Sequence, residues 1–126
     1  MTQIDVTLTI DETLPGFGND RQRKYNYVFN PDLVHVQHRD TRIVYRLARN
    51  DRKRFRMSDI YTSDAADQFS APEVIDDGDA IAITHKNKVK RLTQLLVMVK
   101  VDDCSDTGGG DTLGLDPQVT NDPPPG

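Results

Sequence analysis

The pair of residues with the most distinctive chemistry in this sequence is Asp116-Pro117, near the end of the 126-residue chain. An aspartyl carboxyl group can reach the carbonyl carbon of its own residue through a five-membered ring. The prolyl nitrogen is a tertiary amide, which accepts a proton more readily than an ordinary peptide nitrogen and so leaves more easily. In water this bond breaks only with acid and heat, but a folded site that holds the reacting geometry can lower the barrier by about 7–11 kcal/mol. A second such pair, Asp122-Pro123, follows in the same chain.

The segment around Asp116-Pro117 differs from an ordinary linker. Three glycines at 108–110 predict a flexible hinge, and beyond them apolar residues take every second position: Leu113, Leu115, Pro117 and Val119. A linker has no use for this stripe, so we expect a strand that docks on an edge or groove of the body, with Pro117 at an edge or ladder end because it lacks an N–H. The polar residues 121–126 are expected to be free. The expected organisation is a body over 1–103, a hinge over 104–112 and a docking strand with the Asp-Pro site and free tail over 113–126.

The body is predicted to consist of short strands, because apolar and polar residues alternate in stretches separated by turn residues. Residues 92–101 are the most hydrophobic run and predict a central strand. Residues 58–68 contain few periodic apolar residues, and 63–67 are compatible with a single helical turn. The expected strands of the body cover residues 4–10, 24–29, 33–37, 42–48, 73–75, 80–84 and 92–101. Seven or eight short strands predict an all-β protein, an antiparallel β-sandwich of immunoglobulin-like type.

The run Leu115-Asp116-Pro117-Gln118, near the end of a strand-rich chain of this length, resembles the bacterial DP-EP family. The resemblance implies a small β-sandwich of aspartic-peptidase type that cuts its own C-terminal segment at the Asp-Pro bond. Gly114-Leu115 stand where the family pattern has Ser-Pro. By order and approximate spacing, the resemblance also implies three assisting residues, which are Tyr27 or Tyr25 in an early strand, Asp40, and Lys100 in the last strand before the tail.

Each assisting residue has a possible chemical role. The Tyr27 hydroxyl can donate a hydrogen bond or a proton to the scissile bond. Asp40 can pair with Asp116, one carboxyl protonated and one ionised, so that the pair activates water. The Lys100 ammonium can stabilise an oxyanion or keep a carboxylate ionised. We therefore expect an autoproteolytic aspartic-type peptidase, a hydrolase acting in cis at Asp116-Pro117-Gln118, which releases or retains residues 117–126; attack by water or by the Asp116 carboxylate stays open.

A second class of function stays open from the sequence. In it the chain is a non-catalytic binding or structural β-sandwich that offers its C-terminal strand to a partner chain or to a second copy. Nucleic-acid binding is a third possibility, because a cluster of basic residues has Tyr45 and Phe55 interleaved in it. The basic residues are Arg39, Arg42, Arg46, Arg49, Arg52, Lys53, Arg54 and Arg56. The pI of about 5.2 argues against nucleic-acid binding. A solvated face, or a cradle for the acidic tail, explains the cluster better.

Composition and charge bound the remaining alternatives. The net charge is −4, but from residue 101 onward the chain has six Asp and no Lys or Arg, which leaves 14 acidic against 16 basic residues in 1–100. A single cysteine, Cys104, excludes an internal disulfide and a cysteine-built zinc site. The three histidines, His35, His38 and His85, lack a ligand spacing, so no metal or other cofactor is expected. No signal peptide or membrane span is recognised, and a cytoplasmic location is expected.

Overall fold

The computed structural model describes residues 2–12, 16, 18–19, 25–48, 55–63, 67–101 and 112–124. Within them the chain forms ten strands and one short 3₁₀ helix: β1 (Gln3–Glu12), β2 (Tyr25–Asn30), β3 (Leu33–Val36), β4 (Thr41–Leu47), β5 (Phe55–Thr62), β6 (Glu73–Ile75), η2 (Asp76–Gly78), β7 (Ala80–His85), β8 (Thr93–Val101), β9 (Thr112–Leu115) and β10 (Gln118–Asn121). Residues 104–111 of the expected hinge and 64–66 of the expected helical turn lie outside the described residues.

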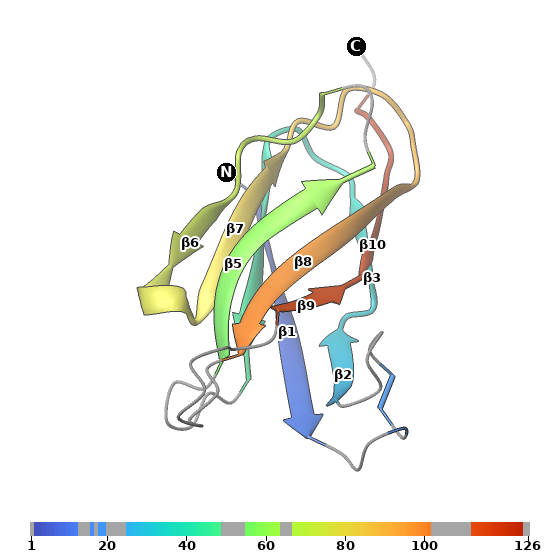
Figure 1. Ribbon diagram of the computed structural model, residues 1–126. Coiled ribbons are helices and arrows are strands. Elements are labelled where there is room, and N and C mark those ends of the chain that lie inside the picture. Colours follow the sequence, from blue (N-terminus) through green and yellow to red (C-terminus); the bar gives the residue numbers. More distant parts are fainter. Residues whose placement is uncertain are drawn as a thin grey trace.

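The strands form two five-stranded sheets, which confirms the prediction of an all-β protein (Figure 1). One sheet has the order β2-β1-β4-β7-β6, and the other has the order β3-β10-β8-β5 with β9 also paired to β8. Both sheets are mixed rather than purely antiparallel, because β1 pairs with β4 and β10 pairs with β3 in parallel. The immunoglobulin-like topology stays a prediction.

The core is formed by side chains that alternate along the strands of both sheets. In β8, Leu95, Val97 and Val99 are buried, while Leu96 and Lys100 point outward. The strand predicted over residues 92–101 is thus present as β8 (Thr93–Val101), and burying its inward side stabilises the fold by the hydrophobic effect. The same period of two buries Val6, Leu8 and Ile10 of β1, so the local pattern and the packing agree.

Strand β5 was not expected from the sequence, because its alternation is interrupted. Phe55, Met57 and Ile60 are buried, so the last interval is three residues instead of two. The pairing register with β8 shifts between Met57 and Asp59, which is the signature of a β-bulge. The extra residue moves the rest of the strand to the opposite phase, and this hides the strand from a search for strict alternation.

Basic residues of the cluster at 39–56 in the sequence are paired with carboxylates in the described part of the structure. Three arginines of this cluster lie within 4.0 Å of a carboxylate of β6 or η2, in the pairs Arg42–Glu73, Arg46–Asp76 and Arg56–Asp77. The acidic partners belong to the body and not to the tail. Phosphate groups of a nucleic acid would have to compete with these carboxylates.

A buried hydroxyl group in the core provides a test of the packing. Tyr45 has no exposed surface and packs edge-on against Phe29, and no described residue accepts or donates a hydrogen bond at its Oη atom. Burial raises the pKa of Tyr45. We expect Tyr45→Phe to leave the free energy of unfolding unchanged or to raise it by up to about 1–2 kcal/mol, because an unpaired buried hydroxyl is destabilising. Urea denaturation measures this, and a loss of stability would contradict it.

Candidate functional site

The tail docks on the body as one strand with a short interruption, as predicted. Leu115 pairs with Val97, and Gln118 pairs with Gln94, so the antiparallel register along β8 is the same on both sides of the break. The Leu95 N–H donates to the Pro117 carbonyl oxygen at 3.0 Å. Pro117 has no N–H with which to return that bond. The ladder is therefore interrupted by a missing donor, while the chain continues in line.

This register fixes the orientation of the Asp116–Pro117 peptide bond. In an antiparallel ladder, successive residues direct their backbone groups to opposite sides. Because Pro117 faces β8 with its carbonyl group, the carbonyl group of Asp116 points away from β8. The side chains also alternate, so Pro117 is buried and Asp116 is exposed. The exposed Asp116 thus lies between two segments that are held by the sheet.

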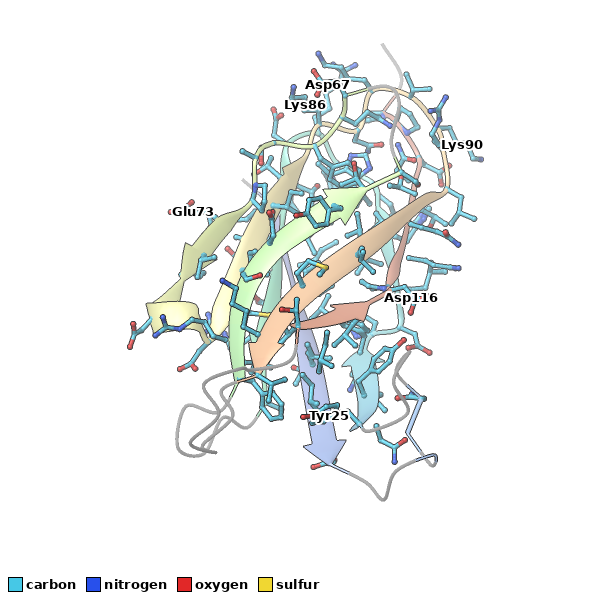
Figure 2. All side chains as sticks on the ribbon, in the orientation of Figure 1. Tyr25, Asp67, Glu73, Lys86, Lys90 and Asp116 are labelled. Atoms are coloured by element: carbon cyan, nitrogen blue, oxygen red, sulfur yellow. The ribbon has the colours of Figure 1, made fainter. Side chains whose placement is uncertain are left out.

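Tyr27 is the side chain that contacts Asp116. Its hydroxyl donates to Asp116 Oδ1 at 2.6 Å, although the two residues are 89 positions apart and belong to different sheets. The Tyr27 ring is half-buried and packs edge-on against Phe29. Tyr25, the alternative left open by the sequence, is buried edge-on against Phe55. In Figure 2 it lies at the far end of β2 from the labelled Asp116.

Asn19 holds the backbone of Tyr27 in place. Its Oδ1 atom accepts from the Tyr27 N–H at 2.8 Å, and its Nδ2 atom donates to the Tyr27 carbonyl oxygen at 2.9 Å. The Asn19 N–H also donates to the carbonyl oxygen of Tyr25 at 2.9 Å. Asn19 therefore acts as a strand partner along the edge of β2. Asn19 lies between the strands expected over 4–10 and 24–29, and nothing in the sequence indicated the role of its side chain.

Two hollows lie on either side of the Tyr27–Asp116 hydrogen bond. The first, of about 520 Å³, is lined partly by Tyr61, Leu96 and Gly114. The second, of about 450 Å³, is lined partly by Asp32, Pro117 and Gln118. Both include Asn19, Tyr27 and Asp116. Asp32 thus brings a second carboxyl group to the hollow that Pro117 lines. It lies between the strands expected over 24–29 and 33–37, and nothing in the sequence marked it.

The structure does not bring Lys100 to Asp116. Lys100 pairs with Thr112 across the ladder, and it is exposed. Asp116 lies four residues further along the same strand line, a distance of about 13 Å at the usual rise per residue. The backbone therefore places the lysine at the other end of β9.

Asp40 is also separated from Asp116. It lies in the turn between β3 and β4, four residues beyond Val36. Val36 pairs with Asn121 at the end of β10, whereas Asp116 precedes the start of that strand. Asp40 and Asp116 therefore lie at opposite ends of the β3–β10 pair, which spans about 16 Å from residue 116 to residue 121. The roles that the family resemblance implies for Lys100 and Asp40 stay predictions.

The end of the tail is anchored, in contrast to the free tail expected from its polar sequence. Asn121 is 1% exposed, and Asp122 pairs with Lys90 at 3.1 Å and lies 3.0 Å from His35. Hydrogen bonds and ion pairing with Lys90, and then with His35, lower the pKa of Asp122. The chain thus carries two Asp-Pro bonds in different surroundings, since Asp116 contacts the phenol of Tyr27 and Asp122 contacts the Lys90 ammonium and the His35 imidazole.

Comparisons with known proteins add no assignment. No protein-family model matches the chain, and no match is found among curated proteins. Within the described residues, no three His, Cys, Asp or Glu side chains gather as a possible metal site. The described part also contains no helix long and apolar enough to cross a membrane.

The support that Asn19 gives to Tyr27 can be tested by mutation. We expect Asn19→Ala to lower the free energy of unfolding by about 1–2 kcal/mol, because it removes two hydrogen bonds to the backbone of β2. The matched control is Asn26→Ala, at an exposed position of the same strand, with an expected change within about 0.5 kcal/mol. Equal effects of the two variants in urea denaturation would contradict the positioning role.

Proposed function

We propose that this protein cleaves its own Asp116–Pro117 bond and is an autoproteolytic peptidase of single turnover. The observation that carries the proposal is the 2.6 Å hydrogen bond from the Tyr27 hydroxyl to Asp116 Oδ1. A docked strand on its own would need no such contact from the opposite sheet. The resemblance of Leu115-Asp116-Pro117-Gln118 to the DP-EP family supports the same reaction.

The first route uses the Asp116 carboxylate as the nucleophile. Its Oδ2 atom attacks the carbonyl carbon of Asp116, the bond from that carbon to the Pro117 nitrogen breaks, and the nitrogen leaves with a proton taken from water. The product is a cyclic anhydride on Asp116 and a new amino terminus at Pro117. One water molecule then opens the anhydride to two carboxyl groups. Tyr27 orients the carboxylate by holding Oδ1, which leaves Oδ2 as the attacking atom.

The second route uses water as the nucleophile. Asp32 and Asp116 line one hollow beside Pro117, and the Asp32 carboxylate can accept a proton from a water molecule as that water attacks the Asp116 carbonyl carbon. The nitrogen of Pro117 leaves with a proton, and the products are the same. In this route Asp32 takes the part that the family resemblance assigns to Asp40.

The contacts of the tail determine what becomes of the product. Residues 118–121 pair with β3 on one side, and residues 118 and 119 pair with β8 on the other. The Asp122 N–H also donates to the Val36 carbonyl oxygen at 2.9 Å. These bonds do not involve the scissile peptide, so the cleaved segment 117–126 stays docked. Of the two outcomes that the sequence left open, the contacts support retention.

Intact-mass spectrometry under denaturing conditions tests the cleavage. We expect protein purified at neutral pH to lose residues 117–126 on storage, and Asp116→Ala to keep its full mass. Tyr27→Phe is expected to slow the loss about tenfold or more, since it removes a hydrogen bond to a charged group. A wild-type mass that stays unchanged for weeks would overturn the proposal.

The same chain contains a matched control. Asp122–Pro123 has the same local chemistry, but Lys90 and His35 engage its carboxylate. We expect no cleavage there and no effect of Asp122→Ala on cleavage at residue 116. Asp32→Asn separates the two routes, because it slows attack by water and leaves attack by the Asp116 carboxylate unchanged. Reaction in oxygen-labelled water checks this, since only the anhydride route can place label in the side-chain carboxyl group.

A further inference from the structure

Strand β10 occupies a slot that is closed on both sides. Its residues pair in parallel with β3 from Gln118 to Asn121, and its first two residues pair antiparallel with β8. Figure 1 shows β10 running between β3 and β8 along the side of the molecule. Val119 has no exposed surface and belongs to the core. The backbone groups therefore hold any extended strand, while the side-chain sites select its sequence.

The most selective position in the slot is that of Asn121. Its Nδ2 atom donates to the Asn87 Oδ1 atom at 2.7 Å and to the Val89 carbonyl oxygen at 2.8 Å. Its Oδ1 atom accepts from the Arg91 N–H at 2.8 Å. The backbone groups fix which end of the amide is the donor. An aspartate here would place a buried carboxylate against two acceptors, so the slot favours asparagine over its closest isostere.

The loop at 87–91, which contacts Asn121, is held in place by a buried glutamine. Gln68 has no exposed surface, and its Oε1 atom accepts from the Lys88 and Val89 N–H groups at 2.8 Å each. Asn87 donates through Nδ2 to the carbonyl oxygen of Asp122 at 2.9 Å. The asparagine site is thus preorganised by buried polar groups, which reduces the ordering that binding a strand requires.

We propose that the slot between β3 and β8 is a sequence-selective peptide site that can accept the Val-x-Asn-Asp strand of a second copy of this chain. The slot complements residues 119–122, and every copy carries that strand. The own strand is tethered and so has a high effective concentration, which makes it the default occupant. Exchange requires that strand to leave. The proposal goes beyond self-cleavage and does not depend on it, although a cut at residue 116 would remove the tether.

Peptide complementation in the full chain tests the slot. In Asn121→Asp the own strand is disfavoured, and the probe is a synthetic peptide with the wild-type sequence of residues 117–124. We expect the peptide to raise the melting temperature of this variant by several degrees in a dose-dependent manner. The same peptide with Asp in place of Asn121 is expected to bind at least about tenfold more weakly. No binding, or equal binding of both peptides, would overturn the proposal.

Two further measurements complete the test. Val119→Ala weakens the docking of the chain's own β10 but leaves Asn121 intact. It is the milder variant to use if Asn121→Asp does not fold, and we expect the wild-type peptide to raise its melting temperature in the same way. The second measurement is native mass spectrometry of Asn121→Asp mixed with isotope-labelled Asp116→Ala, whose residues 117–126 stay attached. It shows whether the slot of one copy binds the strand of another copy. A complex of the two copies supports exchange, whereas peptide rescue without such a complex would refute the second copy as partner. The mass of each chain, recorded in parallel, reports self-cleavage separately.

Discussion

The candidate site depends on an antiparallel ladder along β8 that keeps one register across an interruption at Asp116-Pro117. Residues on both sides of Asp116-Pro117 keep the same register with this strand, so this pair lies between two fixed segments. Pro117 accepts a hydrogen bond from Leu95 and cannot return one. The weakest peptide bond of the segment therefore lies where the ladder lacks a bond, and its rupture would break no inter-strand hydrogen bond.

The two Asp-Pro pairs are the same dipeptide in different surroundings. Asp122 lies beside Lys90 and His35, whose hydrogen bonds and charges stabilise its carboxylate. A carboxylate held in this way is a weaker nucleophile and is committed to other contacts. Asp116 has the phenol of Tyr27 on one oxygen and two hollows beside it. Asp116-Pro117 is thus the candidate reactive pair, whereas Asp122 anchors the tail to the body through Lys90 and His35.

Sequence periodicity predicted the elements whose side chains alternate without interruption. It predicted the docked strand from the stripe between Leu113 and Val119, and it predicted β8 from the run of apolar residues at 92–101. It missed β5 because a bulge shifts the phase of the alternation after Met57. Contacts between distant segments could be proposed only through the family resemblance, which led to Tyr27. Asn19, Asp32 and Asn121 gave no signal, because a polar residue in a turn or tail has the same local pattern whether it is solvated or buried against a partner.

Anchoring of the strand beyond Pro117 determines whether the proposed cleavage could occur more than once in each copy. A peptidase that acts repeatedly must empty its site, but here the strand beyond Pro117 is held by backbone pairing, by buried Val119 and by the amide of Asn121. Breaking one peptide bond removes none of these contacts. The cleaved strand would still fill the slot and keep Pro117 beside Asp116, so the body could not admit another chain until that strand leaves. Stability of the docked strand and repeated catalysis are therefore opposed in this fold, which argues for a reaction that each copy performs once.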